Sequence, residues 1–116
     1  KAPKIFNVNW FRHDEEGHFI WPGFGDNLRV VEWILKRCSG EVDAVETAIG
    51  YVPKAEDINL EGLDFSIDTL KSILEVKNDQ WMKEAEGIEE FYKKFGDKLP
   101  QELKDQLAGL KDRLSK

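Results

Sequence analysis

The chain has 116 residues, of which 34% are charged and 41% are hydrophobic. This length fits one small domain, and no apolar run approaches the roughly 20 residues that a membrane-spanning helix needs. The 17 basic and 23 acidic residues give a net charge of -6, which argues against non-specific binding to nucleic acid, because such binding needs a basic patch. The single cysteine, Cys38, excludes an internal disulfide and a cysteine-rich zinc site. We therefore expect an intracellular protein, and the start at Lys1 rather than Met is expected of a processed chain or of a piece of a longer one.

The first predicted element is a β-hairpin. Residues 5–11 alternate in the manner of a strand, and the sequence Asp14-Glu15-Glu16-Gly17 is typical of a turn. Residues 18–21 would form the returning strand, and Pro22-Gly23 would break it.

A helix is expected next. Asp26 or Asn27 suits its N-cap, and Ser39-Gly40 predicts its end. Its apolar positions recur at helical spacing: Leu28, Val31, Leu35 and Cys38. With further apolar residues widening this stripe, we expect a helix that is buried on most of its surface.

The middle of the chain carries weaker signals. Residues 41–46 are predicted to be a polar linker, and residues 47–52 a short strand closed by Pro53. Residues 54–64 have no clear period, so we expect a surface connection there.

The last third, residues 65–116, is predicted to be a helical tail. Ser66 suits the cap of one helix and Asn78 the cap of a second, which Gly96 would end. Pro100 suits the first turn of a third. The second and third helices carry apolar stripes: Trp81, Ala85, Ile88, Tyr92 and Phe95, then Leu103, Leu107, Leu110 and Leu114. The expected fold class is α+β, with an N-terminal hairpin and short strands followed by a mainly helical part.

An aromatic cluster is the unusual feature of this sequence. Phe11 and Phe19 lie on the two arms of the predicted hairpin, and Phe24 lies on a glycine-flanked loop just before a helix. Three rings on adjacent edges can form a slot that suits a flat heterocycle, because each ring face offers stacking. The Asn27 side chain offers one acceptor and two donors, which is what recognition of a base edge requires.

The alternative is that these aromatic residues only pack a core, as aromatic residues at this density often do. The chain would then be a non-catalytic helical interaction module, with buried rings and no cavity between them. Three further aromatic residues are expected in the core under either interpretation: Trp10, Trp21 and Trp33.

Other candidate sites are weaker. His13 and His18 flank the predicted turn and could hold a metal only with help from Asp14 to Glu16, so exposed histidines are the expectation. Cys38 lies on an apolar stripe, which predicts a buried, inert thiol. The acidic run on the second tail helix is expected to be a solvated face. No phosphate-loop motif occurs in these residues, and no side chain is assigned a catalytic role.

The sequence resembles the GTP-dependent phosphoenolpyruvate carboxykinases. The shared pattern is dense and ordered over residues 3–53, whereas the tail is compatible but not specific. The residues that carry it are Asn9-Trp10-Phe11-Arg12, Gly17, Phe19-Ile20-Trp21-Pro22-Gly23-Phe24-Gly25-Asp26-Asn27, Arg29-Val30, Glu32-Trp33 and Ile49-Gly50-Tyr51-Val52-Pro53.

This resemblance implies that residues 1–116 are the C-terminal part of the nucleotide-binding domain of a larger α/β enzyme. Residues 5–27 would supply the guanine pocket, with Phe11, Phe19 and Phe24 around the base and Asn27 contacting it. One conservative departure is Asp26, where the family often has Glu.

For the parent enzyme, the resemblance implies the reversible conversion of oxaloacetate and GTP to phosphoenolpyruvate, CO₂ and GDP in gluconeogenesis. It also implies a manganese ion at the substrate and a second divalent ion, typified by Mg²⁺, with the nucleotide. The ligands of both ions would lie outside residues 1–116. The parent is expected to be a cytoplasmic monomer, and the 116 residues alone are expected to be inactive.

Overall fold

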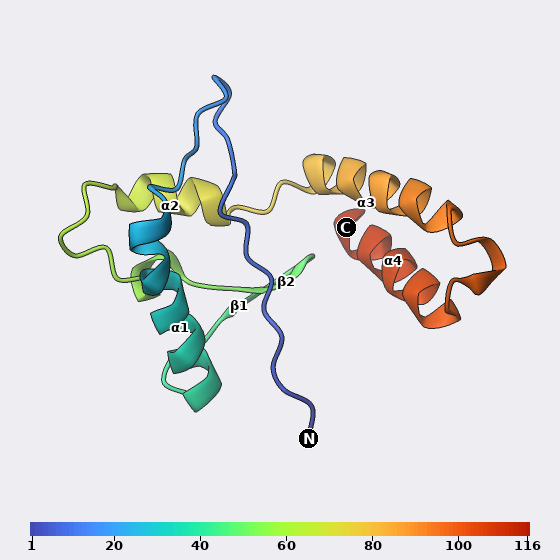
Figure 1. Ribbon diagram of the computed structural model, residues 1–116, viewed down its shortest axis with the longest axis horizontal. Helices are drawn as coiled ribbons and strands as arrows, with labels where there is room; N and C mark the ends of the chain where they lie inside the picture. The colour runs from blue at the N-terminus through green and yellow to red at the C-terminus, as the bar shows by residue number, and fades with distance from the viewer. The chain divides into compact units, whose positions relative to one another are not determined.

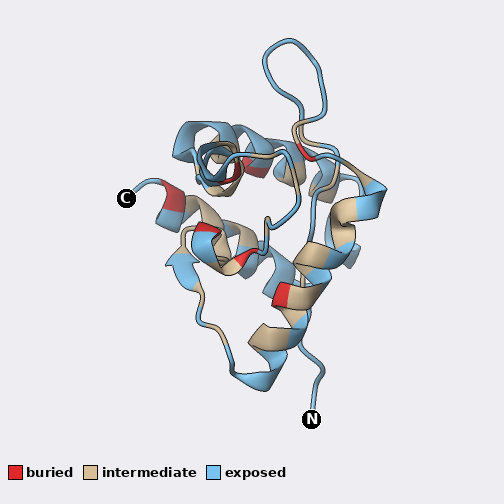
Figure 2. Ribbon diagram, turned by 90° about the vertical axis from the view of Figure 1, so that its left-hand side faces the viewer, coloured by how far each residue is buried: buried red, intermediate tan, exposed pale blue.

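The computed structural model describes all 116 residues (Figure 1). It contains four α-helices, three short 3-10 helices and two short strands, so the predicted α+β class is confirmed. The chain divides into two compact units, one formed by Lys1–Val45 with Val52–Glu75 and the other by Glu46–Tyr51 with Val76–Lys116. Buried residues are few (Figure 2), and four of them form one cluster in the first unit. No helix combines the length and the apolar character that crossing a membrane would require.

The first unit contains the predicted helix α1 (Asn27–Ser39), which follows directly on the 3-10 helix η1 (Phe24–Asp26). Its end is the predicted one. Gly40 takes the left-handed conformation, with φ of 80°, and its N–H donates to the last carbonyl groups of the helix. Glycine is favoured there because a side chain would be strained at this φ.

Helix α2 (Ile67–Leu74) also begins as predicted. The Thr69 backbone N–H donates to Ser66 Oγ over 3.1 Å, which satisfies one of the free donors at the helix N-terminus. The preceding 3-10 helix η2 (Ala55–Asp57) was not predicted.

The core of the first unit joins residues that are far apart in sequence. Trp33 of α1 and Leu70 of α2 pack with Ala55 and Ile58, and the ring of Phe6 meets Trp33 edge-on. The prediction of a surface connection over residues 54–64 was therefore wrong. A 3-10 turn followed by extended chain buries only Ala55 and Ile58 of this segment, which are too few positions to form a recognisable period in the sequence.

The predicted strand over residues 5–11 is absent. One antiparallel bridge, between His13 and Phe19, is all that forms of the N-terminal hairpin. An isolated two-stranded ribbon is only marginally stable in water. Here Phe6 packs on Trp33 while Ile5 remains 91% exposed.

A regular hairpin forms further along the chain. Strands β1 (Val45–Thr47) and β2 (Gly50–Val52) pair with each other, where one strand over residues 47–52 was predicted. Thr47 Oγ1 donates to the Gly50 carbonyl over 2.6 Å and so helps to close the two-residue turn. Gly50 has a φ of 125°, which few other residues tolerate.

The second unit is a helical hairpin of α3 (Asn78–Lys93) and α4 (Gln101–Leu114), joined through the 3-10 helix η3 (Gly96–Lys98). Both helices lie side by side (Figure 1). Ala85 of α3 and Leu114 of α4 are buried, as their apolar stripes predict. The N-cap of α3 is Lys77 rather than the predicted Asn78, and Pro100 is the N-cap of α4.

Candidate functional site

A tight turn lies between Phe11 and Phe19, the first two predicted site residues. The Asp14 and His18 backbones are joined by an N–H to carbonyl bond of 2.8 Å, and Asp14 Oδ1 accepts from the N–H groups of Glu16 and His18, both over 2.9 Å. The bond from the His18 N–H is the main reason that the pKa of Asp14 is lowered, because it favours the charged carboxylate. Gly17 supplies the left-handed residue, with φ of 84°.

Phe11 and Phe19 come together across this turn. Their ring centroids lie 6.0 Å apart with a tilt of 59°, and their exposed fractions are 67% and 62%. Phe19 also stacks on His13, with centroids 4.7 Å apart and a tilt of 27°. The contact between His13 and the aromatic cluster was not predicted. The position of His13 opposite Phe19 across the predicted turn would have been enough to predict it.

Phe24 is the most exposed of the three rings, at 92%. It begins η1, directly after Gly23 with its φ of 118°. No ring contact joins it to Phe11 or Phe19. The structure therefore brings two of the predicted rings together and leaves the third separate.

The fourth predicted residue, Asn27, is half-buried at the start of α1. Its Oδ1 accepts a hydrogen bond of 2.8 Å from the indole Nε1 of Trp21, which is buried as predicted. Because the indole N–H can only donate, it fixes which end of the carboxamide is oxygen. The two Nδ2 hydrogens and one lone pair of Oδ1 then remain for other partners.

Neighbouring charges at this helix start are paired. Asp26 Oδ1 binds Arg29 Nε over 3.0 Å, and Arg29 Nη1 donates to the Asn59 carbonyl over 2.9 Å. These contacts hold the loop before α1 against the segment after η2. Asp26 is thus a structural partner of Arg29, whereas the Nδ2 group of Asn27 remains available to a ligand.

The aromatic-core alternative fails at these three phenylalanines. It predicted buried rings, whereas Phe11, Phe19 and Phe24 are each more than 60% exposed. The buried aromatic side chains are instead Trp21 and Trp33, which hold the scaffold, while Trp10 is half-buried.

The residues that the structure groups as a candidate metal site at the turn differ from the predicted set. Asp14, Glu16 and His18 place one ligand atom each within 4.8 Å of one another, and all three are exposed. His18 Nδ1 lies 3.5 Å from Glu16 Oε2 and 3.8 Å from Asp14 Oδ2. The predicted second histidine, His13, lies against Phe19 instead.

Cys38 also departs from its prediction. It is exposed, because the core takes the opposite side of α1, where Trp33 lies. Because α1 has apolar residues around most of its surface, its sequence does not indicate which side packs against the rest of the chain.

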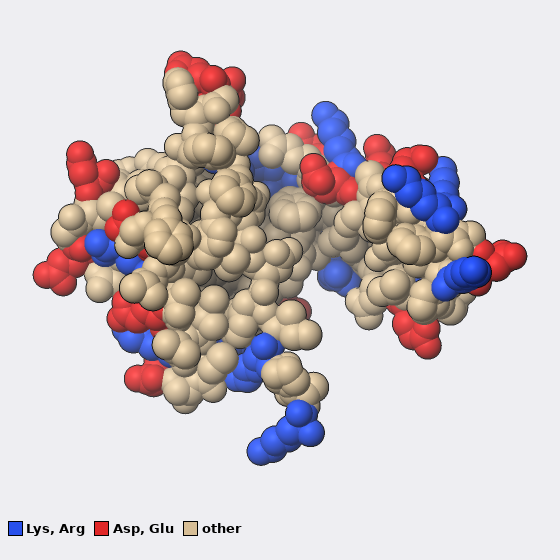
Figure 3. Space-filling view, viewed as in Figure 1, with Lys and Arg blue, Asp and Glu red and all other residues tan.

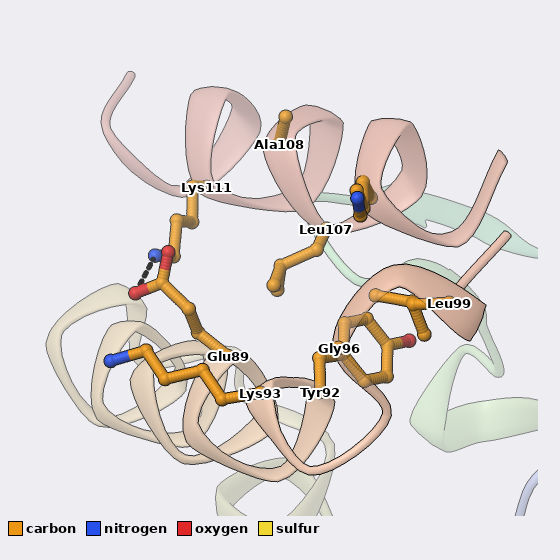
Figure 4. A pocket seen from close by; sticks show the side chains of 9 residues that line it. Glu89, Tyr92, Lys93, Gly96, Leu99, Leu107, Ala108 and Lys111 are labelled. Atoms are coloured by element: carbon orange, nitrogen blue, oxygen red, sulfur yellow. Dashed lines mark ion pairs between the residues drawn. The ribbon is translucent and has the colours of Figure 1, made fainter. Parts of the chain in front are cut away.

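A groove of about 450 Å³ lies in the second unit, between α3 and α4. Figure 4 shows Leu107 directed from α4 into this groove, with Tyr92 and Leu99 nearby. Glu89 and Lys111 form an ion pair of 3.0 Å across one end, and the Lys111 hydrogen bond lowers the pKa of Glu89. No predicted site residue lines this groove.

Comparison with known proteins identifies the family of this chain. The family model described as the phosphoenolpyruvate carboxykinase C-terminal P-loop domain matches residues 1–113. A protein named phosphoenolpyruvate carboxykinase (GTP) from Renibacterium salmoninarum is 54% identical over 114 residues, which are 98% of this chain and 19% of that protein. Relatives of the same name from Paenarthrobacter aurescens and Treponema pallidum are 51% and 53% identical, over 98% and 97% of this chain and 19% and 18% of their own lengths.

The chain thus spans about a fifth of the length of the relatives that it matches. The family match extends from the first residue into α4, so it includes the helical tail as well as the aromatic segment. The chain therefore belongs to the phosphoenolpyruvate carboxykinase family, in which it corresponds to part of the C-terminal P-loop domain.

Proposed function

We propose that residues 1–116 supply the guanine-binding part of a GTP-dependent phosphoenolpyruvate carboxykinase. The full-length enzyme would convert oxaloacetate and GTP to phosphoenolpyruvate, CO₂ and GDP. Three phenylalanine rings that stay outside the core carry this proposal: Phe11, Phe19 and Phe24. Burying such a side chain would stabilise the fold by about 1.5–3 kcal/mol, so their exposure favours a role outside the core.

The ring arrangement is compatible with a slot for a planar base. Phe11 and Phe19 form a tilted pair, whereas Phe24 is free of both. Three phenylalanines packed on one another would leave no room for a base between them. We infer that guanine stacks on Phe24 and is bounded by the Phe11–Phe19 pair, with each stacking contact worth about 1–3 kcal/mol.

The fixed orientation of Asn27 supports selection of guanine. The carboxamide oxygen is held by Trp21, so Nδ2 is the end that can donate to a ligand. Guanine presents the O6 and N7 acceptors on the edge where adenine carries an amino group. An Nδ2 donor facing O6 favours guanine, because both bases share the N7 acceptor but adenine carries an amino donor at position 6. Donor would then face donor, and both groups would lose a partner.

The metal ions of the reaction belong elsewhere in this proposal. Asp14, Glu16 and His18 lie on an exposed turn, which does not fit a site that must also enclose oxaloacetate. We assign the Mn²⁺ and Mg²⁺ sites, the phosphate-binding residues and all catalytic residues to the rest of the protein. The full-length protein would act as a cytoplasmic monomer, and the isolated 116 residues would turn over no substrate.

The proposal is tested by measuring the dissociation constants of GDP for full-length variants. Phe24→Ala should weaken GDP binding by roughly 5- to 150-fold, the value of one stacking contact. Phe91→Ala is the matched control, because Phe91 is 53% exposed on α3 and outside the site. The proposal fails if Phe11→Ala, Phe19→Ala and Phe24→Ala all bind GDP like the Phe91→Ala protein.

A further inference from the structure

His13 and Phe19 face each other across the N-terminal turn. Two backbone hydrogen bonds bracket the pair, one donated by the Asp14 N–H over 2.8 Å and one by the Ile20 N–H over 3.0 Å. His13 and Phe19 are therefore a non-hydrogen-bonded pair of the antiparallel bridge, the kind of pair in which side chains approach most closely. The backbone of the turn thus brings the imidazole and phenyl rings together.

The Phe19 ring lies outside the core of the first unit. Its side chain is 62% exposed, and the rings that it contacts are those of His13 and Phe11. Phe11 and His13 are two residues apart, so they lie on the same face of the ribbon, and Phe11 is the diagonal neighbour of Phe19. His13 is the nearer partner, with centroids 4.7 Å apart against 6.0 Å for Phe11.

The orientation of an exposed ring bears on ligand binding. A free phenylalanine side chain occupies several rotamers, and a ligand that contacts the ring loses affinity when it must fix one of them. The stack with His13, at a tilt of 27°, restricts the ring before a ligand arrives. We propose that His13 is a positioning residue of the guanine site, whose imidazole holds the Phe19 ring where it bounds the base. This inference rests on the proposed guanine site and adds a residue to it.

The charges of the turn indicate that His13 acts on the base and not on the phosphates. Three exposed acidic residues, Asp14, Glu15 and Glu16, follow His13. Figure 3 shows acidic side chains at the tip of the turn, at the top of the view, and uncharged atoms beneath them. Because these carboxylates would repel the phosphates of a nucleotide, we expect the phosphates to extend away from the tip.

The experiment measures the dissociation constant of GDP for full-length variants by titration calorimetry. His13→Ala removes the ring and should weaken GDP binding by roughly 2- to 10-fold, the value of ordering one side chain in advance. His13→Phe keeps a flat ring that can stack on Phe19 and should restore the affinity of the unchanged protein. Because phenylalanine cannot be protonated, this rescue separates ring packing from attraction between a protonated imidazole and the phosphates.

Two controls test whether the effect is specific to the ring contact and to the base. His18→Ala is the matched variant, because His18 belongs to the same turn but lies near Glu16 and Asp14; it should leave the Kd of GDP unchanged. Inorganic pyrophosphate carries the charge of a diphosphate without a base, so its Kd should be unchanged in His13→Ala. An equal loss for GDP and pyrophosphate would reveal a structural or electrostatic effect and overturn the inference.

The Phe19→Ala variant separates failure of this inference from failure of the guanine site. If Phe19→Ala weakens GDP binding while His13→Ala binds GDP like the His18→Ala protein, the guanine site stands and the role of His13 is wrong. If Phe19→Ala leaves GDP binding unchanged, this ring is not part of the site and the inference fails with it. A His13→Phe protein that binds GDP as weakly as His13→Ala would also contradict positioning by a flat ring.

Discussion

Replacing Asn27 by Asp should separate recognition of guanine from folding. The substitution keeps an oxygen where Trp21 Nε1 donates over 2.8 Å, so the indole N–H retains its acceptor. It replaces the Nδ2 donor by a carboxylate oxygen, which would face the guanine O6 as acceptor against acceptor. We expect the free energy of unfolding to change by less than about 1 kcal/mol, the usual net value of one hydrogen bond.

The cost to binding is larger. Leaving the guanine acceptor unpaired costs about 1–3 kcal/mol, or roughly 5- to 150-fold in Kd. The added negative charge also repels the phosphates, so the quantity to measure is the ratio of the Kd values for ADP and GDP, in which this repulsion cancels. Titration calorimetry on the full-length protein gives both values.

Asn27→Ala is the companion variant. It removes the acceptor of the Trp21 indole as well, so it should lower the free energy of unfolding by about 1–3 kcal/mol. If Asn27→Asp leaves the ADP to GDP ratio of Kd values unchanged, the proposed role of the carboxamide in base selection is wrong. If Asn27→Asp destabilises the protein as much as Asn27→Ala does, the Trp21 bond does not have the value given to it here.

Three further outcomes follow from the same structure. Phe24→Ala should leave the unfolding midpoint unchanged in denaturant titrations, because a ring that is 92% exposed contributes little buried area; a clear loss of stability would place this ring in the core. Leu70→Ala should lower the free energy of unfolding by about 2–5 kcal/mol, since Leu70 is 4% exposed in the core of the first unit; a loss below about 1 kcal/mol would contradict that packing. The pKa of Asp14 is lowered from its ordinary value of 3.8. The contribution of this carboxylate to stability should therefore be complete above pH 3.8 and disappear as the pH falls through the folded-state pKa. NMR titration of the carboxyl group measures this pKa, and a value at or above 3.8 would refute the hydrogen bonds from the Glu16 and His18 N–H groups.

Local rules were sufficient for much of the helical structure. Gly40 ends α1 and Ser66 caps α2 where the sequence predicts, because capping and chain reversal depend on hydrogen bonds between residues only a few positions apart. The same holds for the choice of Phe11, Phe19 and Phe24 as candidates, which came from residue types and their order.

Burial depended on partners that are distant in the sequence. Ile58 enters the core because Trp33 and Leu70 surround it, and no local period predicts that meeting. The predicted strand over residues 5–11 lacks a neighbouring strand to complete it, so its backbone stays irregular.

The candidate site also combines features that the sequence indicates with features that only the tertiary structure decides. Sequence alone named Asn27, but only the tertiary structure brings the Trp21 indole to its oxygen and so decides which end of the amide can meet a ligand. Likewise, Cys38 belongs to an apolar stripe in the sequence, and only the packing of Trp33 on the opposite side of α1 leaves that stripe exposed. Hydrophobic pattern states which residues favour burial, whereas the geometry of distant contacts decides which of them obtain it.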